Sequence, residues 1–258
     1  MIELIASVSH WLPVVFLLSV RVGTTFALMP APFGALAPMP IRAILGLAVA
    51  VTLLLPRAEL IDLVPPDPLA IGLAAIGEAM VGGVIGLTVR VTLAATEIAG
   101  TMAGFSMGLG FATSVDPTFG ESSLPTTRAL SALAVVIFFS LQGHHVVLTA
   151  LMTSIEVAPP GDTMGVISQE GILTIGSDML AQGLRIAAPV VATMFIVQLG
   201  TGLVSRSAPR VHIFAMTFAI AITAGLLTML VSAPSLASAI AVDINQLPER
   251  LLTALGGS

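Results

Sequence analysis

Long apolar stretches, separated by short polar connections, dominate the pattern of hydrophobic and polar positions along the chain. A helix that crosses the hydrocarbon core of a bilayer, about 30 Å thick, needs roughly 20 apolar residues. Ile41–Leu55 is short for such a span, whereas Ala129–Val157 and Ile172–Ser205 are long, so we predict helices that are broken, folded into hairpins or buried in protein. The stretches are Leu4–Met29, Ile41–Leu55, Leu69–Val89, Val91–Val115, Ala129–Val157, Ile172–Ser205 and Val211–Val242.

The composition is that of a membrane protein. Hydrophobic residues make up 56% of the 258 positions and charged residues only 9%, whereas an ordinary soluble domain has about 25% charged residues. The mean hydropathy is +1.06. The amino terminus contains Glu3 and lacks the basic start of a signal peptide, so we expect the first span to be retained. The sequence therefore predicts an all-α, polytopic, integral membrane-type fold.

The residue types that several kinds of chemistry require are missing. The chain has no cysteine, which excludes disulfides and thiolate metal sites. Its basic residues are all arginine, which excludes the lysine of a phosphate-binding loop. His144 and His145 are adjacent, so they point about 100° apart on a helix, and no further ligand follows at a metal-binding spacing. From these missing residue types and spacings we predict no cofactor and no metal. The net charge of -5 gives no reason to expect a nucleic-acid partner.

Charges in the connections predict a topology. Arginines mark three connections, and the positive-inside rule places those in the cytoplasm. If successive spans cross the membrane in alternating directions, this placement requires an amino terminus outside the cell and four crossings before Ala129–Val157. That stretch must then enter and leave on the same side of the membrane. A polar break divides that stretch into arms of about 13 residues, a re-entrant length, so we predict a helical hairpin. The arginines are Arg42, Arg90, Arg206 and Arg210, and the hairpin bend is Gln142, Gly143, His144 and His145.

A stripe of glycines precedes the most distinctive loop of the chain. Gly100, Gly104 and Gly108 repeat every four residues, so on a helix they form a bare face that another helix can approach closely. The loop that follows is rich in glycine and in large apolar side chains, which suits a flexible seal. We therefore predict a helix-packing face beside a deformable apolar loop. The residues predicted for the loop are Met107, Leu109, Phe111, Asp116, Pro117 and Phe119.

Several charged or polar residues interrupt the apolar stretches, and each charge costs about 2.5–3.5 kcal/mol at a membrane centre on insertion scales. Two interpretations stay open for these charges: they lie near interfaces or pair with one another, or they face protein or a water-filled lumen. The charges are Arg21, Glu78, Glu97, Asp178 and Arg185. Asp178, Gln182 and Arg185 are spaced i, i+4, i+7 and share a helix face. We predict that this second group faces a partner subunit.

One short motif suggests an enzyme. Residues 104–108 match G-x-S-x-G, the nucleophile elbow of hydrolases, which requires a strand–turn–helix context. Here the motif lies in an apolar glycine-rich helix. An intramembrane serine hydrolase that uses Ser106 with His144 is therefore an alternative carried by the motif match alone.

Four runs of sequence carry a family resemblance. They are residues 21–56, SMGLGFATSVDP at 106–117, FFSLQGHHVVLTALMTSIEVAPPG at 138–161 and GLVSRSAPRVHIFAMTFAIAITAGLL at 202–227. Together they resemble the FliR family of export-gate proteins, which serves flagella and injectisomes. The chain departs from the family pattern at Ala208-Pro209-Arg210, at His212 and at Phe218-Ala219. These departures concern the contacts of the carboxy-terminal hairpin.

The resemblance implies a non-enzymatic pore component in the bacterial inner membrane, at the flagellar basal body. Its partners in such a hetero-oligomer are FliP-like and FliQ-like subunits, an FlhB-like switch protein and unfolded export substrates. Residues 1–170 are implied to be FliP-like and residues 171–258 FliQ-like, and the loop 108–123 is implied to be the pore plug. Such subunits sit largely outside the bilayer plane. An injectisome homologue and a small-molecule transporter are alternatives.

Overall fold

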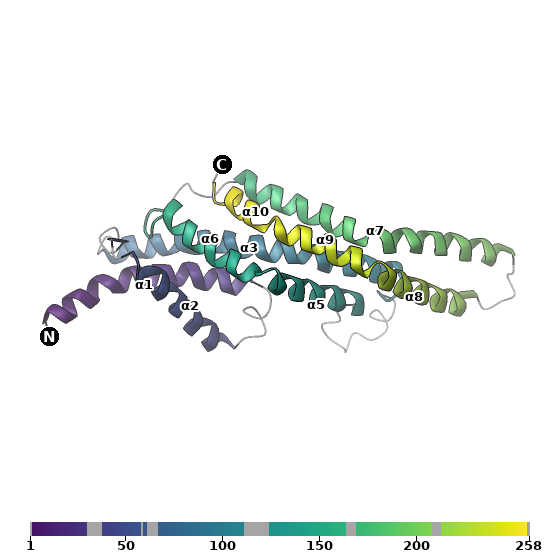
Figure 1. Cartoon of the computed structure of the whole chain (residues 1–258), viewed down its shortest axis with the longest axis horizontal. Coiled ribbons are helices and arrows are strands. Elements are labelled where there is room, and N and C mark those ends of the chain that lie inside the picture. Colours follow the sequence, from purple (N-terminus) through teal and green to yellow (C-terminus); the bar gives the residue numbers. More distant parts are fainter. Residues whose placement is uncertain are drawn as a thin grey trace. The chain divides into compact units, whose positions relative to one another are not determined.

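The computed structural model describes residues 2–29, 38–57, 59–60, 67–110, 124–163, 169–207 and 213–256, which are almost wholly α-helical and contain no strand. The predicted all-α fold with several long apolar helices is therefore confirmed (Figure 1). The helices are α1 (Ile2–Leu28), α2 (Met39–Leu54), α3 (Pro68–Ser106), α5 (Pro125–Ser140), α6 (Gly143–Val157), α7 (Gln169–Ser207), α8 (Ile213–Val231), α9 (Ala233–Asn245) and α10 (Leu247–Ala254).

Proline begins several of these helices. Pro68, Pro125 and Pro248 each stand in the first turn, where the missing N–H is not needed and the fixed φ suits the helix. At the start of α3, the Asp67 carboxylate also accepts a hydrogen bond from the Ala70 amide (3.3 Å). That contact satisfies one of the backbone donors that a helix leaves unpaired at its amino end.

The helix α3 corrects the predicted topology. We expected two spans, Leu69–Val89 and Val91–Val115, joined by a connection at Arg90, but α3 runs without a break through all 39 residues from Pro68 to Ser106. Arg90 is exposed while its neighbour Val89 is buried, so one charge on the outer face does not end the helix, and arginine is a good helix former. The scheme of four crossings before the bend is therefore wrong.

Three helices of the described residues are long and apolar enough to cross a membrane, over Trp11–Leu28, Pro68–Ser106 and Leu173–Ser207. The number rises to five if each of two bent helix pairs is one span. One of these pairs arises because the predicted stretch Val211–Val242 is divided at Ser232 into α8 and α9. At 1.5 Å per residue, α3 and α7 are each about 58 Å long, roughly twice the hydrocarbon thickness.

The contacts divide the chain into two compact units that interleave in sequence. Unit 1 comprises Met1–Val91, Gln142–Gly176 and Gln246–Ser258, and unit 2 comprises Thr92–Leu141 and Ser177–Asn245. The predicted division into residues 1–170 and 171–258 follows the sequence and does not coincide with these units. It describes likeness to two kinds of subunit and stays a prediction.

In unit 1, α1 packs on α3 with very little space between the backbones. A Cβ added at Gly82 would collide with the Arg21 carbonyl oxygen and the Thr24 hydroxyl, and one added at Gly86 would lie 2.6 Å from the Thr25 carbonyl oxygen. The Thr25 hydroxyl donates to the Gly82 carbonyl oxygen (3.0 Å). Such close approach at glycines spaced four apart is typical of helices that associate in membranes.

Unit 2 has its own apolar core. The buried cluster consists of Ala103 and Met107 from α3, Val190 and Met194 from α7, and Ala221 from α8. In the same unit α7 approaches α3 at Gly183, where an added Cβ would lie 3.0 Å from the Ala95 carbonyl oxygen. The carboxy-terminal part of α3 is therefore packed against two other helices, α7 and α8.

Gly82→Ala should destabilise unit 1 because the new methyl group has no space beside α1. We expect the free energy of unfolding in detergent micelles to fall by about 1–3 kcal/mol. Gly83→Ala is the matched control, since only Leu28 comes as near as 4.0 Å to an added Cβ there, and alanine should raise helix stability by up to about 1 kcal/mol. Equal effects of the two substitutions would show that the α1–α3 contact is loose.

Candidate functional site

A buried ion pair lies at the centre of unit 1. The Arg21 Nε donates to the Glu78 Oε2 at 2.6 Å, and neither side chain is more than 1% exposed. The other guanidinium nitrogens donate to the Ser154 hydroxyl (3.1 Å) and to the Ala158 carbonyl oxygen (2.8 Å). The Glu78 Oε1 accepts from the Gly161 amide (3.2 Å). This network joins α1, α3, the end of α6 and the turn after it.

The pairing answers one question that the sequence left open. Arg21 and Glu78 lie 57 positions apart in sequence, yet they form an ion pair in the interior. Because each guanidinium nitrogen and each carboxylate oxygen has at least one hydrogen-bond partner, two charges are accommodated in an apolar surrounding. Glu97, by contrast, is exposed on the surface of α3.

The predicted glycine face of α3 lies against the start of α5, within unit 2. A Cβ added at Gly100 would lie 2.5 Å from the Thr127 Cα, and one added at Gly104 would lie 2.7 Å from the Leu124 Cδ1. The Thr126 hydroxyl donates to the Gly100 carbonyl oxygen (2.7 Å). The residues that begin α5 are thereby fixed on α3.

Gly108 has a separate role, because it ends α3. Its φ is +81°, a left-handed conformation that favours glycine. The Leu109 amide donates to the Gly104 carbonyl oxygen and the Gly108 amide to the Phe105 carbonyl oxygen, both at 3.0 Å. These are hydrogen bonds of a helix carboxy-terminal cap. The Gln198 side chain on α7 donates to the Ser106 carbonyl oxygen (3.0 Å) and completes the end of the helix.

Only the beginning of the predicted plug lies among the described residues. Met107 is 1% exposed and belongs to the core of unit 2, where a Cβ added at Gly225 would lie 2.5 Å from its Cγ. Leu109 packs partly buried against the same cluster. In this conformation Met107 therefore faces helices and not a lumen. Phe111, Asp116, Pro117 and Phe119 lie outside the described residues.

The predicted hairpin bend coincides with a break between helices. α5 ends at Ser140 and α6 begins at Gly143, and Gln142 has a φ of 57°, which is left-handed for a non-glycine residue. The bend at the break is 65°. A broken span and a re-entrant loop can both have this form, so the return of the chain to the same side stays a prediction. His144 and His145 lie in the first turn of α6.

The polar face predicted on α7 is largely at the surface of the chain. Asp178 and Arg185 are exposed, and Gln182 is half-buried beside them. The next residue, Gly183, is buried against α3, so this helix turns one face inward and carries the charged residues outside. Their contact with a partner subunit stays a proposal.

The environment of Ser106 does not resemble that of a hydrolase nucleophile. The Ser106 hydroxyl donates to the Ala103 carbonyl oxygen (2.7 Å) at the last turn of a helix. A nucleophile elbow instead places its serine between a strand and a helix, and no strand occurs in the parts of the chain that the structure describes. Within those parts there is also no group of three or more histidine or acidic residues placed to hold a metal ion.

Sequence reasoning missed the contact of α1 with α3. Gly82 and Gly86 have the same four-residue spacing as the glycines at 100 and 104, and Glu78 stands four residues earlier on the same face. This spacing was the signal that could have found both the close approach and the position of the charge.

Known proteins resemble the chain over most of its length. The profile of the family described as bacterial export proteins, family 1, matches residues 12–247. The flagellar biosynthetic protein FliR of Pectobacterium carotovorum subsp. carotovorum is 29% identical over 222 residues, which cover 84% of this chain and 85% of the relative. FliR of Escherichia coli (strain K12) is 28% identical over 200 residues, 77% of each. The Yop proteins translocation protein T of Yersinia pestis is 27% identical over 146 residues, 55% of this chain and 56% of the relative.

Glu78→Ala should be among the most damaging single substitutions, because it leaves the Arg21 guanidinium buried without its counter-charge. We expect the free energy of unfolding in micelles to fall by about 3–5 kcal/mol. Replacing both partners by methionine should recover much of this loss, since two apolar side chains need no pairing. The control is Glu156→Ala, which breaks the exposed pair with Arg57 and should cost at most about 1 kcal/mol. A double variant as unstable as Glu78→Ala would contradict the explanation by charge burial.

Cysteine labelling tests the bend at Gln142. The chain has no cysteine of its own, so Ala129→Cys and Val157→Cys, both at exposed positions, give unique sites at the two outer ends of the broken pair. A re-entrant loop predicts that an impermeant maleimide reacts with both from the same side of sealed vesicles. Reaction from opposite sides would establish a broken span.

Proposed function

This chain belongs to the bacterial export proteins, family 1, and from this membership we propose that it is a structural and pore-forming subunit of the flagellar type III protein export gate. In this role it admits unfolded flagellar proteins through the bacterial inner membrane. Relatives named as flagellar FliR match more of the chain, 84% and 77%, than the injectisome relative at 55%. This difference favours the flagellar system over the injectisome.

The length of the exposed apolar faces carries the proposal. Large apolar side chains are exposed on α7 from Leu173 (74%) to Leu203 (68%), a distance of about 45 Å along the helix. A hydrocarbon core of about 30 Å covers only part of such a face unless the helix is strongly tilted. The part of this apolar face that lies outside the hydrocarbon core must be covered by other protein subunits. A hetero-oligomer with FliP-like and FliQ-like subunits and an FlhB-like switch protein supplies them.

The end of α3 is suited to carry the closing element of such a pore. An idle export channel must exclude ions and still pass an unfolded chain, so its seal should be apolar and reversible. The segment 108–123 starts where Gly108 ends α3, and Leu124 is packed against Gly104 where α5 begins. Both ends of the proposed plug are therefore attached to the same helix. We assign the plug role to this segment.

Three alternative functions each predict a different experimental result. A serine hydrolase predicts stoichiometric reaction of Ser106 with an active-site serine probe. A small-molecule transporter predicts flux in liposomes that contain this chain alone. An injectisome gate predicts that the gene restores injectisome secretion but not swimming. The export-gate proposal predicts no labelling at Ser106, no flux without the partner subunits, and rescue of a motility mutant.

Gly104→Leu should block assembly and motility while membrane insertion stays intact. The added side chain has no room between α3 and the start of α5, so the region that enters the gate cannot pack. Gly72→Leu, on the same helix but with nothing within 4 Å of an added Cβ, is the matched control and should swim. Co-purification of the partner subunits and swimming in soft agar are the measurements. If the Gly104→Leu strain assembles and swims normally, the close contact between Gly104 and the start of α5 is not required for assembly.

Deleting residues 110–120, or changing Phe111 to Ser, should make the assembled gate leak small ions when no export substrate is present. The apolar seal is lost in the first case and made polar in the second. Conductance of the purified complex in planar bilayers measures the effect, and Leu12→Ser, at an exposed position of α1, is the control. A deletion variant that assembles and stays as tight as the parent would place the seal elsewhere.

A further inference from the structure

The end of α3 is held by side chains from both α7 and α8, within unit 2. The Met107 side chain, 1% exposed, belongs to a buried cluster with Met194 of α7 and Ala221 of α8. At Gly225 of α8, a Cβ would lie between 2.5 and 2.7 Å from three atoms of that methionine, its Cγ, Cε and Sδ. The absence of a side chain at Gly225 therefore leaves a recess, which the end of the Met107 side chain fills.

Two further contacts hold the residues on either side of this methionine. Gln198 of α7 donates to the Ser106 carbonyl oxygen (3.0 Å), and the Phe218 ring of α8 lies 3.2 Å from a Cβ added at Gly108. Gly108 is the residue at which α3 ends, with a φ of +81°. The contacts from α7 and α8 therefore fix the position from which the chain leaves the helix.

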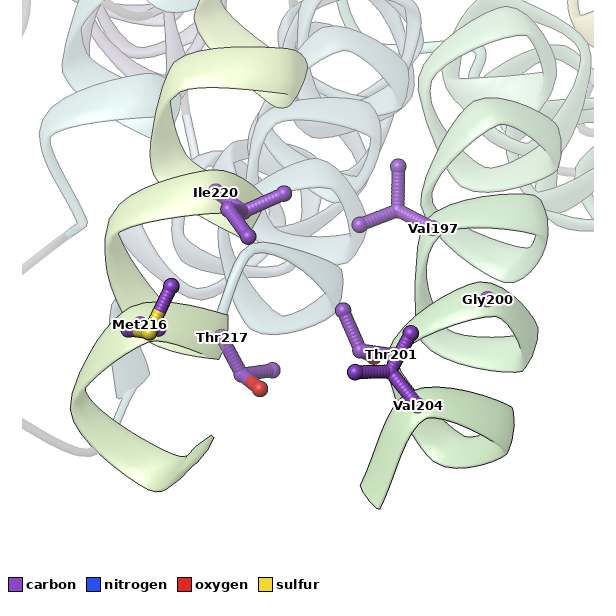
Figure 2. A pocket seen from close by; sticks show the side chains of 7 residues that line it. All are labelled: Val197, Gly200, Thr201, Val204, Met216, Thr217 and Ile220. Atoms are coloured by element: carbon purple, nitrogen blue, oxygen red, sulfur yellow. The ribbon is translucent and has the colours of Figure 1, made fainter. Parts of the chain in front are cut away.

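The two helices α7 and α8 are not closely packed next to this cluster. A pocket of about 320 Å³ lies between them, and Figure 2 shows Val197 of α7 and Ile220 of α8 on opposite sides of it. Val197 also packs against the cluster that contains Met107. A close-packed interior resists displacement, because a side chain there cannot move without its neighbours. The pocket therefore leaves room for α8 to shift against α7 beside the methionine.

We propose that Met107 is a positioning residue, which couples the place of α8 to the chain that continues from the end of α3. While α8 offers its recess, the methionine holds the cap at Gly108 in place. When α8 shifts, the methionine loses the recess and the cap is released. The proposal rests on the plug role proposed above for the segment after α3, and it adds the helix pair that controls that segment.

A double-mutant cycle between the methionine and its recess tests the coupling. Gly225→Ala puts a methyl group where three atoms of Met107 lie, so the side chain must leave the recess. Met107→Ala removes the same three atoms, and the two substitutions are made singly and together. Gly202→Ala on α7 is the matched control, because an added Cβ there meets nothing within 4 Å. Gln198→Leu removes one hydrogen bond at the surface, so it should assemble even if a core variant does not.

Hydrogen exchange of the Gly108 and Leu109 amides, measured on the full chain in micelles, reports on the cap, since both amides donate within it. We expect each single variant of the cycle to exchange at least about tenfold faster than the parent, because the cap opens locally. When residue 107 is already alanine, Gly225→Ala should change the rate by less than about twofold. Gly202→Ala should exchange as the parent does. Unchanged exchange in Gly225→Ala, or an equal effect of this substitution in both backgrounds, would overturn the proposal.

Conductance of the assembled gate in planar bilayers measures whether the cap controls closure. Gly225→Ala and Gln198→Leu should leak small ions without export substrate, and Gly202→Ala should stay tight. The deletion of residues 110–120 separates this proposal from the proposed function. If the deletion leaks while both variants stay tight, the proposal is overturned and the plug role stands. If the deletion itself stays tight, the plug role fails and the proposal fails with it.

Discussion

Close approach of helix backbones at the glycines of α3 is the constraint on which the rest of the structure depends. At Gly82 the helix meets α1, and at Gly100 it meets the start of α5. In both places a threonine hydroxyl of the neighbouring segment donates to the carbonyl oxygen of that glycine, Thr25 at 3.0 Å and Thr126 at 2.7 Å. Apolar burial does little to drive helices together in lipid, where close packing and hydrogen bonds take over. The same kind of contact thus serves both units.

The charges of the apolar stretches divide into two kinds. Arg21 and Glu78 are fully buried and paired, with further hydrogen bonds that tie the end of α6 to α1 and α3. Arg90, Glu97 and Arg185 are instead exposed on the outer faces of long helices. A membrane interior tolerates such exposed charges poorly. They fit a chain whose outer faces meet water or other subunits over part of their length, as we propose for the export gate.

The sequence predicted the helical class well, because long apolar stretches separated by short polar connections are a strong signal. It failed at Arg90, since a charged residue between two apolar stretches looks like a connection, although one exposed arginine does not interrupt a helix. It also left the partner of Arg21 open, because an ion pair across 57 positions follows from tertiary packing. The spacing of the glycines at 100 and 104 was visible in the sequence and predicted a close helix contact, but it did not show which segment makes that contact. Only the structure identifies α5, and it assigns Gly108 to the end of the helix.

Imaging of the assembly tests the central claim most directly, namely that protein and not lipid alone covers the long apolar faces of this chain. The chain, tagged and co-expressed with FliP-like, FliQ-like and FlhB-like subunits, would be purified and imaged by electron cryomicroscopy. We predict a hetero-oligomer in which other subunits pack along the exposed side of α7 from Leu173 to Leu203, beyond the thickness of the micelle. Particles that contain this chain alone, with α7 enclosed in detergent along its whole length, would contradict the account.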